Sequence, residues 1–598
     1  MKTYQLLLPL LLGASLEATT FEPIEVHSAN DATQKVANIT ENVKIITSKA
    51  IQESRLTTLA QVLGQLGNVA FTSNGAVGQA SSFYLRGMDS KHTLVLLDGV
   101  RINDVTGLNG AQFEHLPMHD IERIEIIKGA QSGIWGADAA AGVINIITKS
   151  ASKGTHASFS QSYGSFDTHE SKAMASYNEG IVSLKGSASS YSTNGISVAE
   201  AKYGDVLYGT RGYESNYTND RYLNSAFGLD ATLAFTPNDR LHASLKKVRA
   251  YSEYDSGAGS DGTNYANLDN TFYAVDARHT DAINDAKLSV NYSDFARDLG
   301  IGNDYTGSVL QLRGSEQLNY LPESFLIVGG DYQRHTHLES YGSDLNKTFT
   351  TKALYIANAN RIGDTIASQN LRYDLFSNAQ GVWTGKVGLK QYVGDWYASA
   401  NWGTGYTVPT LYQLYTTWGG NANLVPEESV GYDVSIGSPW IEVTYYENQI
   451  RNLIVYTSAY ENSAGISTFK GIEIAAHYAL EKLLRIDADY ALIDARNASG
   501  LFLARRPKQL GHINVTNTFG DAFSTMTQLE YVGERYEKVD ETGAMTGNYA
   551  LVNLTANYHA ETYGAFVQLN NLFNTFYQTV DGYGTMGINF KVGIDAAF

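Results

Sequence analysis

The chain has 598 residues, of which 43% are apolar and 17% charged, and its 43 basic and 61 acidic residues give a net charge of −18. So acidic a chain repels phosphate backbones, and we expect no nucleic acid partner. Because cysteine is absent, disulfides, thiolate metal sites, cysteine nucleophiles and lipid attachment through an N-terminal cysteine are excluded.

The first residues have the order of a secretory signal peptide. Lys2 precedes an apolar run from Leu6 to Leu12, and small residues follow as far as Ala18. This run is far shorter than the roughly 20 apolar residues of a membrane-spanning helix, and no later segment is long enough. We therefore expect a signal peptide at 1–18, secretion of the remainder, and no transmembrane helix.

The next part of the chain, as far as Lys149, has the composition of a small α+β domain. Runs of Val and Ile alternate with a stretch in which Leu56, Leu59, Leu63 and Leu66 recur at three- and four-residue spacing. That spacing places the four leucines on one face of a helix.

After Lys149 the chain becomes a series of short alternating segments separated by Gly, Asn, Asp and Ser. In the last of them Phe590, Val592 and Ile594 share one face, opposite Lys591 and Asp595. A soluble sandwich alternates in the same way. However, about 448 residues follow Ser150, which suits about 22 strands at roughly 20 residues per strand and connection. Since lipid cannot satisfy an open sheet edge, such a sheet in a membrane must close into a barrel.

Several segments, in this order, resemble the TonB-dependent outer-membrane receptor family. They are FYLRGMD (83–89), LVLLDGVRIND (94–104), IERIEIIKGAQSGIWGADAAAGVINIITK (121–149), WGTGYTVPTLYQL (402–414), NANLVPEES (421–429), FKGIE (469–473) and NNLFNTFY (570–577). The resemblance covers essentially the whole chain. It implies an all-β membrane barrel of about 22 antiparallel strands (151–598), with an N-terminal α+β plug domain (38–150) inside its lumen. The location implied is the outer membrane of a Gram-negative bacterium, where the multi-pass barrel contacts lipid, and the activity is import of a scarce nutrient.

Ahead of the plug, a periplasmic N-terminus at 19–37 contains a segment that resembles a TonB box. Its residues are Glu22, Pro23, Ile24, Glu25, Val26, His27, Ser28 and Ala29. An extended peptide of this kind pairs through its backbone with the edge of a partner sheet. The resemblance implies TonB and its ExbB–ExbD inner-membrane complex as partners. The alternative is a disordered mature N-terminus.

Two cations of the plug stand among apolar strand residues and, if buried, require partners. We expect Arg86 and Lys128 to pair with lumenal acids such as Glu428 or Glu473, and so to dock the plug through a polar interface. The alternative is that each is an ordinary solvated charge.

The segment NGAVGQASSFYLRG (74–87) resembles the first plug loop of the cobalamin (vitamin B12) receptors in this family. The resemblance implies a corrinoid ligand, although Leu108 stands where a small polar residue is more usual. The ligand-binding residues implied are Asn74, Gln79, Ser81, Gly107, Leu108 and Asn109. Turn-forming polar residues are the alternative for the first loop, and a ferric siderophore or another metal chelate is the alternative cargo.

No cofactor is required by this interpretation. Calcium could order acidic extracellular loops, and its candidate ligands are Asp205, Asp220 and Asp255. Solvated loop carboxylates are the alternative.

Other classes of protein fit the sequence less well. No nucleophile elbow, phosphate-binding Gly loop or H-E-x-x-H motif occurs, so we do not expect an enzyme. A passive porin or an outer-membrane hydrolase would need neither a plug nor a TonB box.

Overall fold

The computed structural model describes residues 25–26, 32, 34–108, 110–209, 217–255, 260–262, 264–300, 302, 304–340, 343–377 and 379–598. The signal peptide expected at 1–18 lies outside the described residues. Among those that are described, no helix is long and apolar enough to cross a membrane.

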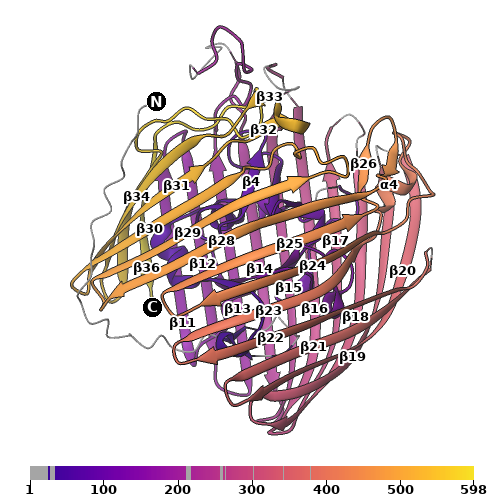
Figure 1. Cartoon of the computed structure of the whole chain (residues 1–598). Coiled ribbons are helices and arrows are strands. Elements are labelled where there is room, and N and C mark those ends of the chain that lie inside the picture. The colour runs from indigo at the N-terminus through magenta and orange to yellow at the C-terminus, as the bar shows by residue number, and fades with distance from the viewer. Residues whose placement is uncertain are drawn as a thin grey trace.

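Twenty-two antiparallel strands pair in chain order into a closed barrel, and β36 completes the ring by pairing with β11 (Figure 1). The strands are β11 (Gly154–Gly164), β12 (Thr168–Asn178), β13 (Val182–Thr193), β14 (Tyr222–Ala234), β15 (Asp239–Tyr254), β16 (Asn264–Thr280), β17 (Asn284–Asp298), β18 (Asp304–Leu321), β19 (Ser324–Ser340), β20 (Ser343–Ile362), β21 (Thr365–Phe376), β22 (Val382–Val393), β23 (Trp396–Thr407), β24 (Glu427–Gly437), β25 (Ile441–Arg451), β28 (Ile466–Leu480), β29 (Leu484–Arg496), β30 (Gln509–Phe519), β31 (Phe523–Val532), β34 (Tyr549–His559), β35 (Tyr563–Asn570) and β36 (Asn589–Ala597). The prediction of a barrel of about 22 antiparallel strands is confirmed.

Strand β24 shows why these segments form a membrane barrel. Its inward residues, among them Ser429 and Asp433, are polar and buried, whereas outward residues such as Val434 and Ile436 are apolar and exposed. Successive strand residues point to opposite faces, so a two-residue period gives each strand one polar and one apolar face. Here the apolar face is the exposed one, as expected of a barrel that faces lipid.

The two ends of the barrel differ in their connections. At one end β-strands are joined by short turns such as 179–181 and 235–238, and at the other by long segments such as 194–221 and 571–588. Short turns are typical of the periplasmic end and long loops of the extracellular end. The extracellular end is therefore at the top of Figure 1, where β26 (Ile454–Tyr456), β27 (Tyr460–Asn462), β32 (Tyr536–Lys538), η4 (Val539–Glu541), β33 (Thr542–Met545) and α4 (Leu411–Tyr415) lie in the loops.

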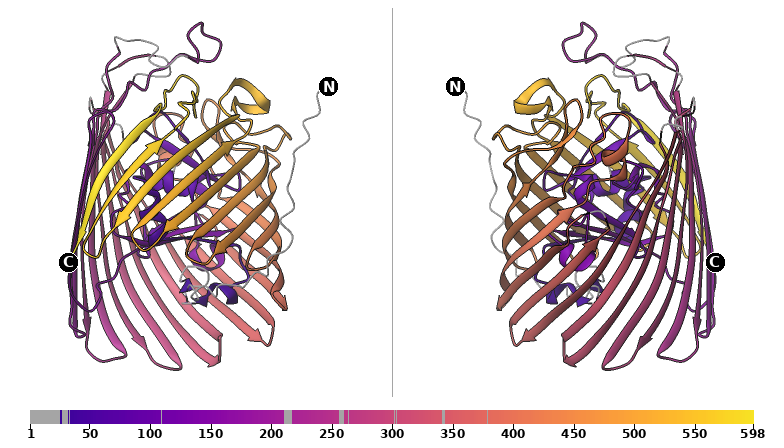
Figure 2. Two further views of the ribbon diagram at one scale, coloured as in Figure 1. Left: turned by 90° about the vertical axis from the view of Figure 1, so that its left-hand side faces the viewer. Right: turned by 90° about the vertical axis from the view of Figure 1, so that its right-hand side faces the viewer.

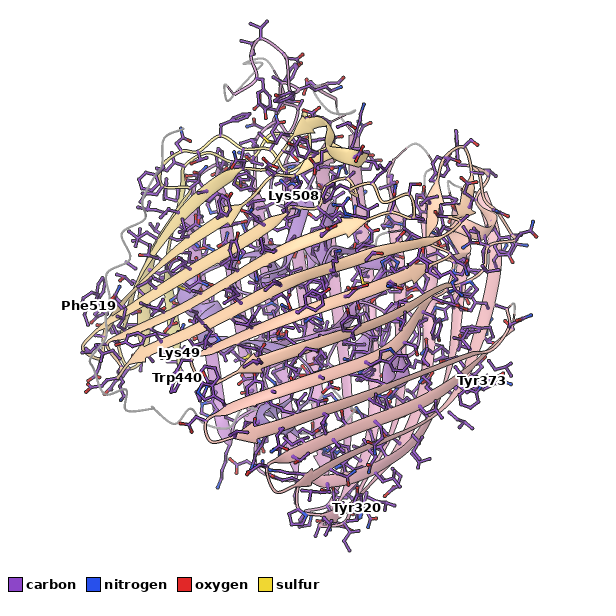
Figure 3. The ribbon with its side chains drawn as sticks, in the orientation of Figure 1. Lys49, Tyr320, Tyr373, Trp440, Lys508 and Phe519 are labelled. Atoms are coloured by element: carbon purple, nitrogen blue, oxygen red, sulfur yellow. The ribbon has the colours of Figure 1, made fainter. Side chains whose placement is uncertain are left out.

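Aromatic rings gather near the periplasmic strand ends. Trp396 and Trp440 meet edge to face with ring centroids 6.3 Å apart. Tyr320 is the last residue but one of β18 and Phe519 the last of β30, and both are about half exposed (Figure 3). Rings that are partly apolar and partly polar suit the interface between membrane and water.

The plug fills the middle of the lumen (Figure 2). Its core is a five-stranded sheet with the order β3-β9-β10-β7-β8. Short helices and a separate three-stranded sheet, β4-β5-β6, complete the plug. The bounds are β1 (Glu25–Val26), β2 (Gln34–Lys35), η1 (Val36–Asn38), β3 (Val43–Thr47), α1 (Ser48–Ser54), α2 (Leu59–Gln65), β4 (Ala70–Ser73), β5 (Ser81–Leu85), β6 (Met88–Asp89), η2 (Ser90–His92), β7 (Thr93–Leu97), β8 (Val100–Arg101), η3 (Phe113–His115), β9 (Ile121–Lys128), α3 (Ser132–Trp135) and β10 (Gly142–Thr148).

Helix α2 forms where the leucine spacing predicted a helix. Thr58 caps its first turn in a reciprocal capping box with Gln61. Leu59 and Leu63 are buried in the core that the plug shares with the barrel wall. The helix therefore holds the plug surface that faces the extracellular cavity described next.

Candidate functional site

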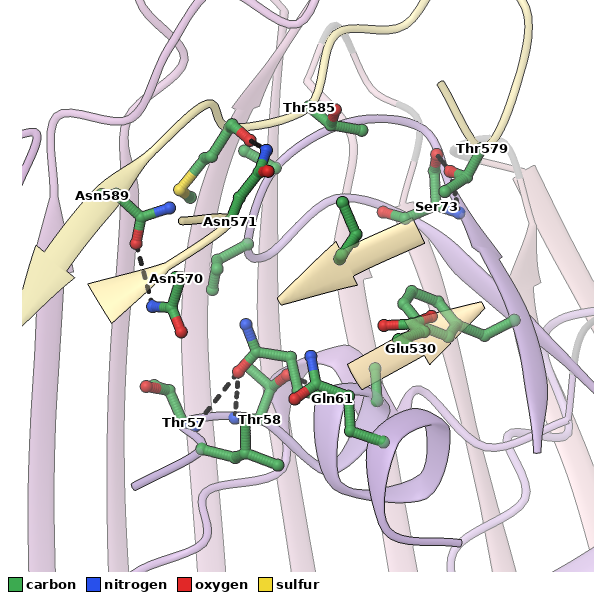
Figure 4. Close-up of a pocket in the computed structure, with 18 of the residues that line it drawn as sticks. Thr57, Thr58, Gln61, Ser73, Glu530, Asn570, Asn571, Thr579, Thr585 and Asn589 are labelled. Atoms are coloured by element: carbon green, nitrogen blue, oxygen red, sulfur yellow. Dashed lines mark hydrogen bonds between the residues drawn. The ribbon is translucent and has the colours of Figure 1, made fainter. Parts of the chain in front are cut away.

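A cavity of about 160 Å³ lies between the plug and the extracellular half of the barrel wall (Figure 4). We call it the apical cavity. The plug side consists of the start of α2 and the loop 75–78, and the barrel side consists of β31, β34, β35 and the loop 571–588. Its lining residues include Thr57, Thr58, Gln61, Ser73, Glu114, Glu530, Tyr549, Asn553, Asn571, Tyr577 and Thr585.

Amide and hydroxyl groups line this cavity together with apolar side chains and the aromatic rings of Phe71, Tyr549 and Tyr577. The loop 571–588 is fixed to the plug, because Thr579 Oγ1 donates to the Ser73 carbonyl at 2.6 Å and the Ser73 N–H donates back at 2.9 Å. The rings of Tyr549 and Tyr577 lie 4.6 Å apart. Glu114 and Glu530 are the only Asp, Glu, Lys or Arg residues among the described residues that line the cavity. Such a surface suits a neutral ligand with amide and hydroxyl groups.

A second, smaller cavity of about 50 Å³ lies beside the plug segment 103–110. Gly107 and Leu108, predicted to bind ligand, both line it, together with Lys91 and Arg101. Asn109, predicted with them, lies outside the described residues.

The first plug loop is held against the barrel, and its predicted residues take different places. Ser81 lines the apical cavity. Gln79 is buried, and its side-chain amide donates to the Glu253 carbonyl at 2.7 Å, so in this structure it holds the loop to β15. Asn74 is half-buried, its N–H donates to the Ala80 carbonyl at 3.0 Å, and it is not among the residues that line the apical cavity.

Gly78 explains the close approach of this loop to the wall. Its φ is +86°, and a Cβ at this position would lie 2.1 Å from a ring carbon of Tyr222. Only glycine fits a left-handed backbone pressed on an aromatic ring.

The plug cations Arg86 and Lys128 lie at a shared carboxylate. Arg86 Nη2 lies 2.9 Å from Glu473 Oε2, Lys128 Nζ lies 2.7 Å from Glu473 Oε1, and Arg86 also reaches Asp433 at 3.3 Å. The choice of Glu428 as a partner was wrong, because Glu428 is exposed on the outer face of β24. Its neighbour Glu427 faces the lumen instead, where it accepts from Lys91 Nζ at 2.7 Å.

Two of the three candidate calcium ligands meet. Asp220 and Asp255 are buried side by side, and their carboxylates accept from the backbone N–H groups of Val198 and Ala199. Burial raises the pKa of Asp220 to about 7. Asp205 is exposed and accepts from the Lys202 N–H in a turn of its own. Within the described parts of the chain, no group of three or more His, Asp and Glu side chains could hold a metal ion.

The TonB-box segment is described only at Glu25 and Val26. These two residues form β1 and pair antiparallel with Lys35 and Gln34 of β2. Val26 is fully buried in a small apolar cluster with Ile39 and Ile127. The other predicted residues, Glu22, Pro23, Ile24, His27, Ser28 and Ala29, lie outside the described residues.

Replacing Glu114 with glutamine should remove a pH dependence of plug stability. Burial raises the pKa of Glu114 to about 8 from an ordinary value of 4.5, and its Oε2 has no hydrogen-bond partner. The contribution of the neutral Glu114 carboxyl to the free energy of unfolding is therefore fully present below pH 4.5, and it is lost as the pH rises through about 8. Thermal unfolding of the wild type and Glu114→Gln should agree at pH 5 and diverge at pH 9, with the variant more stable. Equal melting temperatures at pH 9 would contradict this assignment.

Comparisons with known proteins agree with this architecture. The family model described as "TonB dependent receptor-like, beta-barrel" matches residues 160–572, and the "TonB-dependent Receptor Plug Domain" matches residues 35–143. Curated relatives from two Vibrio species carry the name vitamin B12 transporter BtuB. The one from Vibrio cholerae is 27% identical over 95% of this chain and 94% of its own length, and the one from Vibrio vulnificus is 29% identical over 97% and 95%.

Solved structures share the fold at lower identity. The siderophore receptor PirA from Acinetobacter baumannii has a TM-score of 0.81 at 16% identity, and covers 93% of this chain and 98% of its own. A mutant of the ferric enterobactin receptor PfeA from Pseudomonas aeruginosa has a TM-score of 0.79 at 17% identity, with the same coverage. At such identities the likeness concerns the fold alone. A 22-stranded barrel filled by its own plug, and matched by both family models, identifies this chain as a member of the TonB-dependent receptors of the outer membrane.

Proposed function

We propose that this receptor imports a corrinoid of the cobalamin type. The observation that carries the proposal is the match to vitamin B12 transporters over nearly the full length of both chains. The apical cavity supports it, because a corrinoid displays many amide groups and an aromatic base, which amide, hydroxyl and tyrosine side chains can bind.

The charge of the apical cavity favours a neutral cargo over an anionic one. A ferric catecholate siderophore is strongly negative, whereas the described lining of this cavity contains no Lys, Arg or His. Nothing there would offset the cost of removing an anion from water. A ferric siderophore remains the second candidate, since Lys91 and Arg101 line the smaller cavity.

Transport in this proposal involves no chemical change in the ligand. The ligand binds at the plug apices, the TonB box pairs with TonB in the periplasm, and the ExbB–ExbD complex supplies the energy for the plug to move. TonB would pair with the backbone of the extended TonB box, and at Glu25 and Val26 that backbone is already paired with β2. The β1–β2 pairing would therefore have to be released first.

Equilibrium binding to the detergent-purified chain tests the cargo. We expect tight binding of cyanocobalamin and weak binding of a ferric catecholate siderophore. Tyr577→Ala should weaken cyanocobalamin binding by about tenfold, because an aromatic wall contributes roughly 1–1.5 kcal/mol. Tyr320→Ala, at the opposite end of the barrel, is the matched control and should leave the affinity unchanged. Tight siderophore binding without cyanocobalamin binding would move the cargo to the second candidate.

Calcium is tested in the same titration. Burial raises the pKa of both Asp220 and Asp255, so a rise in pH ionises the pair, and a divalent cation would then relieve their repulsion and order the loops that hold them. Added calcium should then raise the affinity at pH 8, and Asp220→Asn should remove that increase. No effect of calcium on the wild type would leave the two carboxyls as a purely structural pair.

A further inference from the structure

We propose that the imported ligand leaves the receptor along one wall of the barrel, formed by β13, β14 and β15, and that five charged side chains at the plug–barrel interface close this route in the structure. The proposal rests on the transport function proposed above. It adds which side of the plug separates from the barrel and which residues hold that side shut.

Two cavities follow one another along this wall. The upper, interface cavity has a volume of only about 30 Å³ and lies between the plug segment 116–121 and inward residues of the three strands, such as Ser187 and Val248. The lower, periplasmic cavity has about 360 Å³ and lies between the end of β10 and inward residues such as Arg240 and His242. Thr148 lines both. The route is therefore wide at its periplasmic end and too narrow for a ligand above.

A cluster of five charged side chains stands where the two cavities meet. We call it the gate cluster, and its members are Asp98 and Asp120 of the plug and Lys185, Asp230 and Lys246 of the barrel. Lys246 and Asp120 line the interface cavity, and the other three line the periplasmic cavity. The cluster therefore forms the partition between the cavities.

The distances show that the gate cluster joins plug to barrel. Lys185 Nζ lies 3.4 Å from Asp120 Oδ2 and 3.2 Å from Asp230 Oδ2. Lys246 Nζ lies 2.8 Å from Asp230 and 3.7 Å from both Asp98 and Asp120. Hydroxyl groups complete the network, since Ser187 Oγ donates to Asp120 at 3.1 Å and Thr148 Oγ1 donates to Asp98 at 2.8 Å.

A polar partition of this kind can open without unfolding either side. Apolar surfaces that separate lose their burial, whereas charges that separate into water regain their hydration. Two lysines against three aspartates hold the closed state while water is excluded, and water entering from the periplasmic cavity solvates all five as the plug side moves away. The ion pairs of the gate cluster are therefore strong while water is excluded and weak once water has entered.

The upper end of the route reaches the apical cavity through one plug segment. Glu114 lines the apical cavity, and residues 116–121 line the interface cavity. Within this segment Pro117 forms an isolated antiparallel bridge with Thr58, which also lines the apical cavity. Displacing the segment 113–121 would therefore join all three cavities into one passage.

Pairs of cysteines can test the route cleanly because the chain contains no cysteine of its own. Asp120→Cys with Ser187→Cys locks the plug to β13 across the gate cluster, where the native side chains are 3.1 Å apart. Ala130→Cys with Gly403→Cys is the matched control on β23, ten strands further around the ring of 22. A Cβ on Gly403 would lie 3.4 Å from that of Ala130, close to disulfide geometry.

The readout is uptake and surface binding of radiolabelled cyanocobalamin by energised cells, before and after reduction of the cross-link. We expect the gate lock to abolish uptake but not binding, with recovery on reduction, and the control lock to transport like the wild type. If both locks block uptake, the plug moves as one body and the proposal is wrong. It is equally wrong if the gate-locked protein still transports.

A second measurement needs no cargo, so it separates this proposal from that of the substrate. Ser187→Cys is buried, and a small membrane-impermeant thiol reagent should label it slowly in purified protein. Adding Lys185→Met and Lys246→Met should raise the labelling rate by about tenfold or more, since three unpaired carboxylates draw in water. Asp120→Asn is a milder variant that should act in the same direction.

Lys386→Met is the control for labelling, because it removes an ion pair of similar length, 2.7 Å to Glu41, on another part of the wall. It should leave the labelling rate at Ser187→Cys unchanged. Equal rates in all four backgrounds would show that the gate cluster does not close the route. Failure of the wild type to take up cyanocobalamin, with the labelling result intact, would count against the substrate alone.

Discussion

Replacing Glu473 with alanine should destabilise docking of the plug by about 3–5 kcal/mol, the cost of removing one partner from a buried ion pair. Glu473 is the shared acceptor of Arg86 and Lys128, whose side chains are 1% and 7% exposed. Without it Lys128 has no other carboxylate within 4 Å in the described part of the chain, and Arg86 keeps only Asp433 at 3.3 Å. Glu473→Lys should be worse, because it adds a third cation to the same site.

Hydrogen exchange of the backbone amides in β9, which ends at Lys128, measures the effect directly. Glu428→Ala is the matched control, a loss of the same carboxylate from the outer face, and it should change stability by no more than about 0.5 kcal/mol. Equal protection of β9 in the two variants would refute the idea that Glu473 docks the plug.

Deleting residues 22–29 should reduce uptake to background while leaving ligand binding at the cell surface intact. The reason is that the barrel and plug apices fold without this segment, whereas the proposed link to TonB lies within it. Replacing the segment with a Gly/Ser sequence of equal length should have the same effect. The length of the N-terminus would be kept, but TonB would lose the strand with which it pairs. Uptake of radiolabelled cyanocobalamin and equilibrium binding on whole cells provide the two readouts.

The deletion also has an outcome that would rule out the TonB-box assignment. If the deleted receptor still transports, the N-terminal segment is a disordered tail and the energy must enter elsewhere. Lost binding together with lost uptake would point instead to a misfolded plug, since β1 packs Val26 against Ile39 and Ile127.

Much of the fold could be predicted because the barrel rests on a local rule. A two-residue period identifies a half-exposed strand wherever it occurs, and residues 590–595 show it as clearly in sequence as in structure. What the period does not reveal is which of two adjacent acids faces the lumen. Glu428 was chosen and Glu427 is the inward one, a shift of a single residue that reverses the face.

The candidate site was less predictable because it is built from residues far apart in the chain. A buried plug cation needs an acid, so the search for a partner of Arg86 was sound, and the match to Glu473 depends on a strand nearly 400 residues later. Nothing local marks Asp120, Lys185 and Lys246 as neighbours, or Thr58 and Asn571 as walls of one cavity. Gln79 was predicted to bind the ligand, but in the structure its side-chain amide donates to the Glu253 carbonyl in the barrel wall.

The seam between β11 and β36 sets the order of events during assembly. These strands pair Ser158 with Ala597, the widest separation in sequence between neighbouring strands of the ring. Contacts between such distant segments carry the largest loop-closure entropy and so tend to form last. Until they form, the sheet is an open ribbon with two unpaired edges, and the plug, which precedes β11, can settle against the growing inner surface. The last hydrogen bonds to form would then enclose a domain that is already in place.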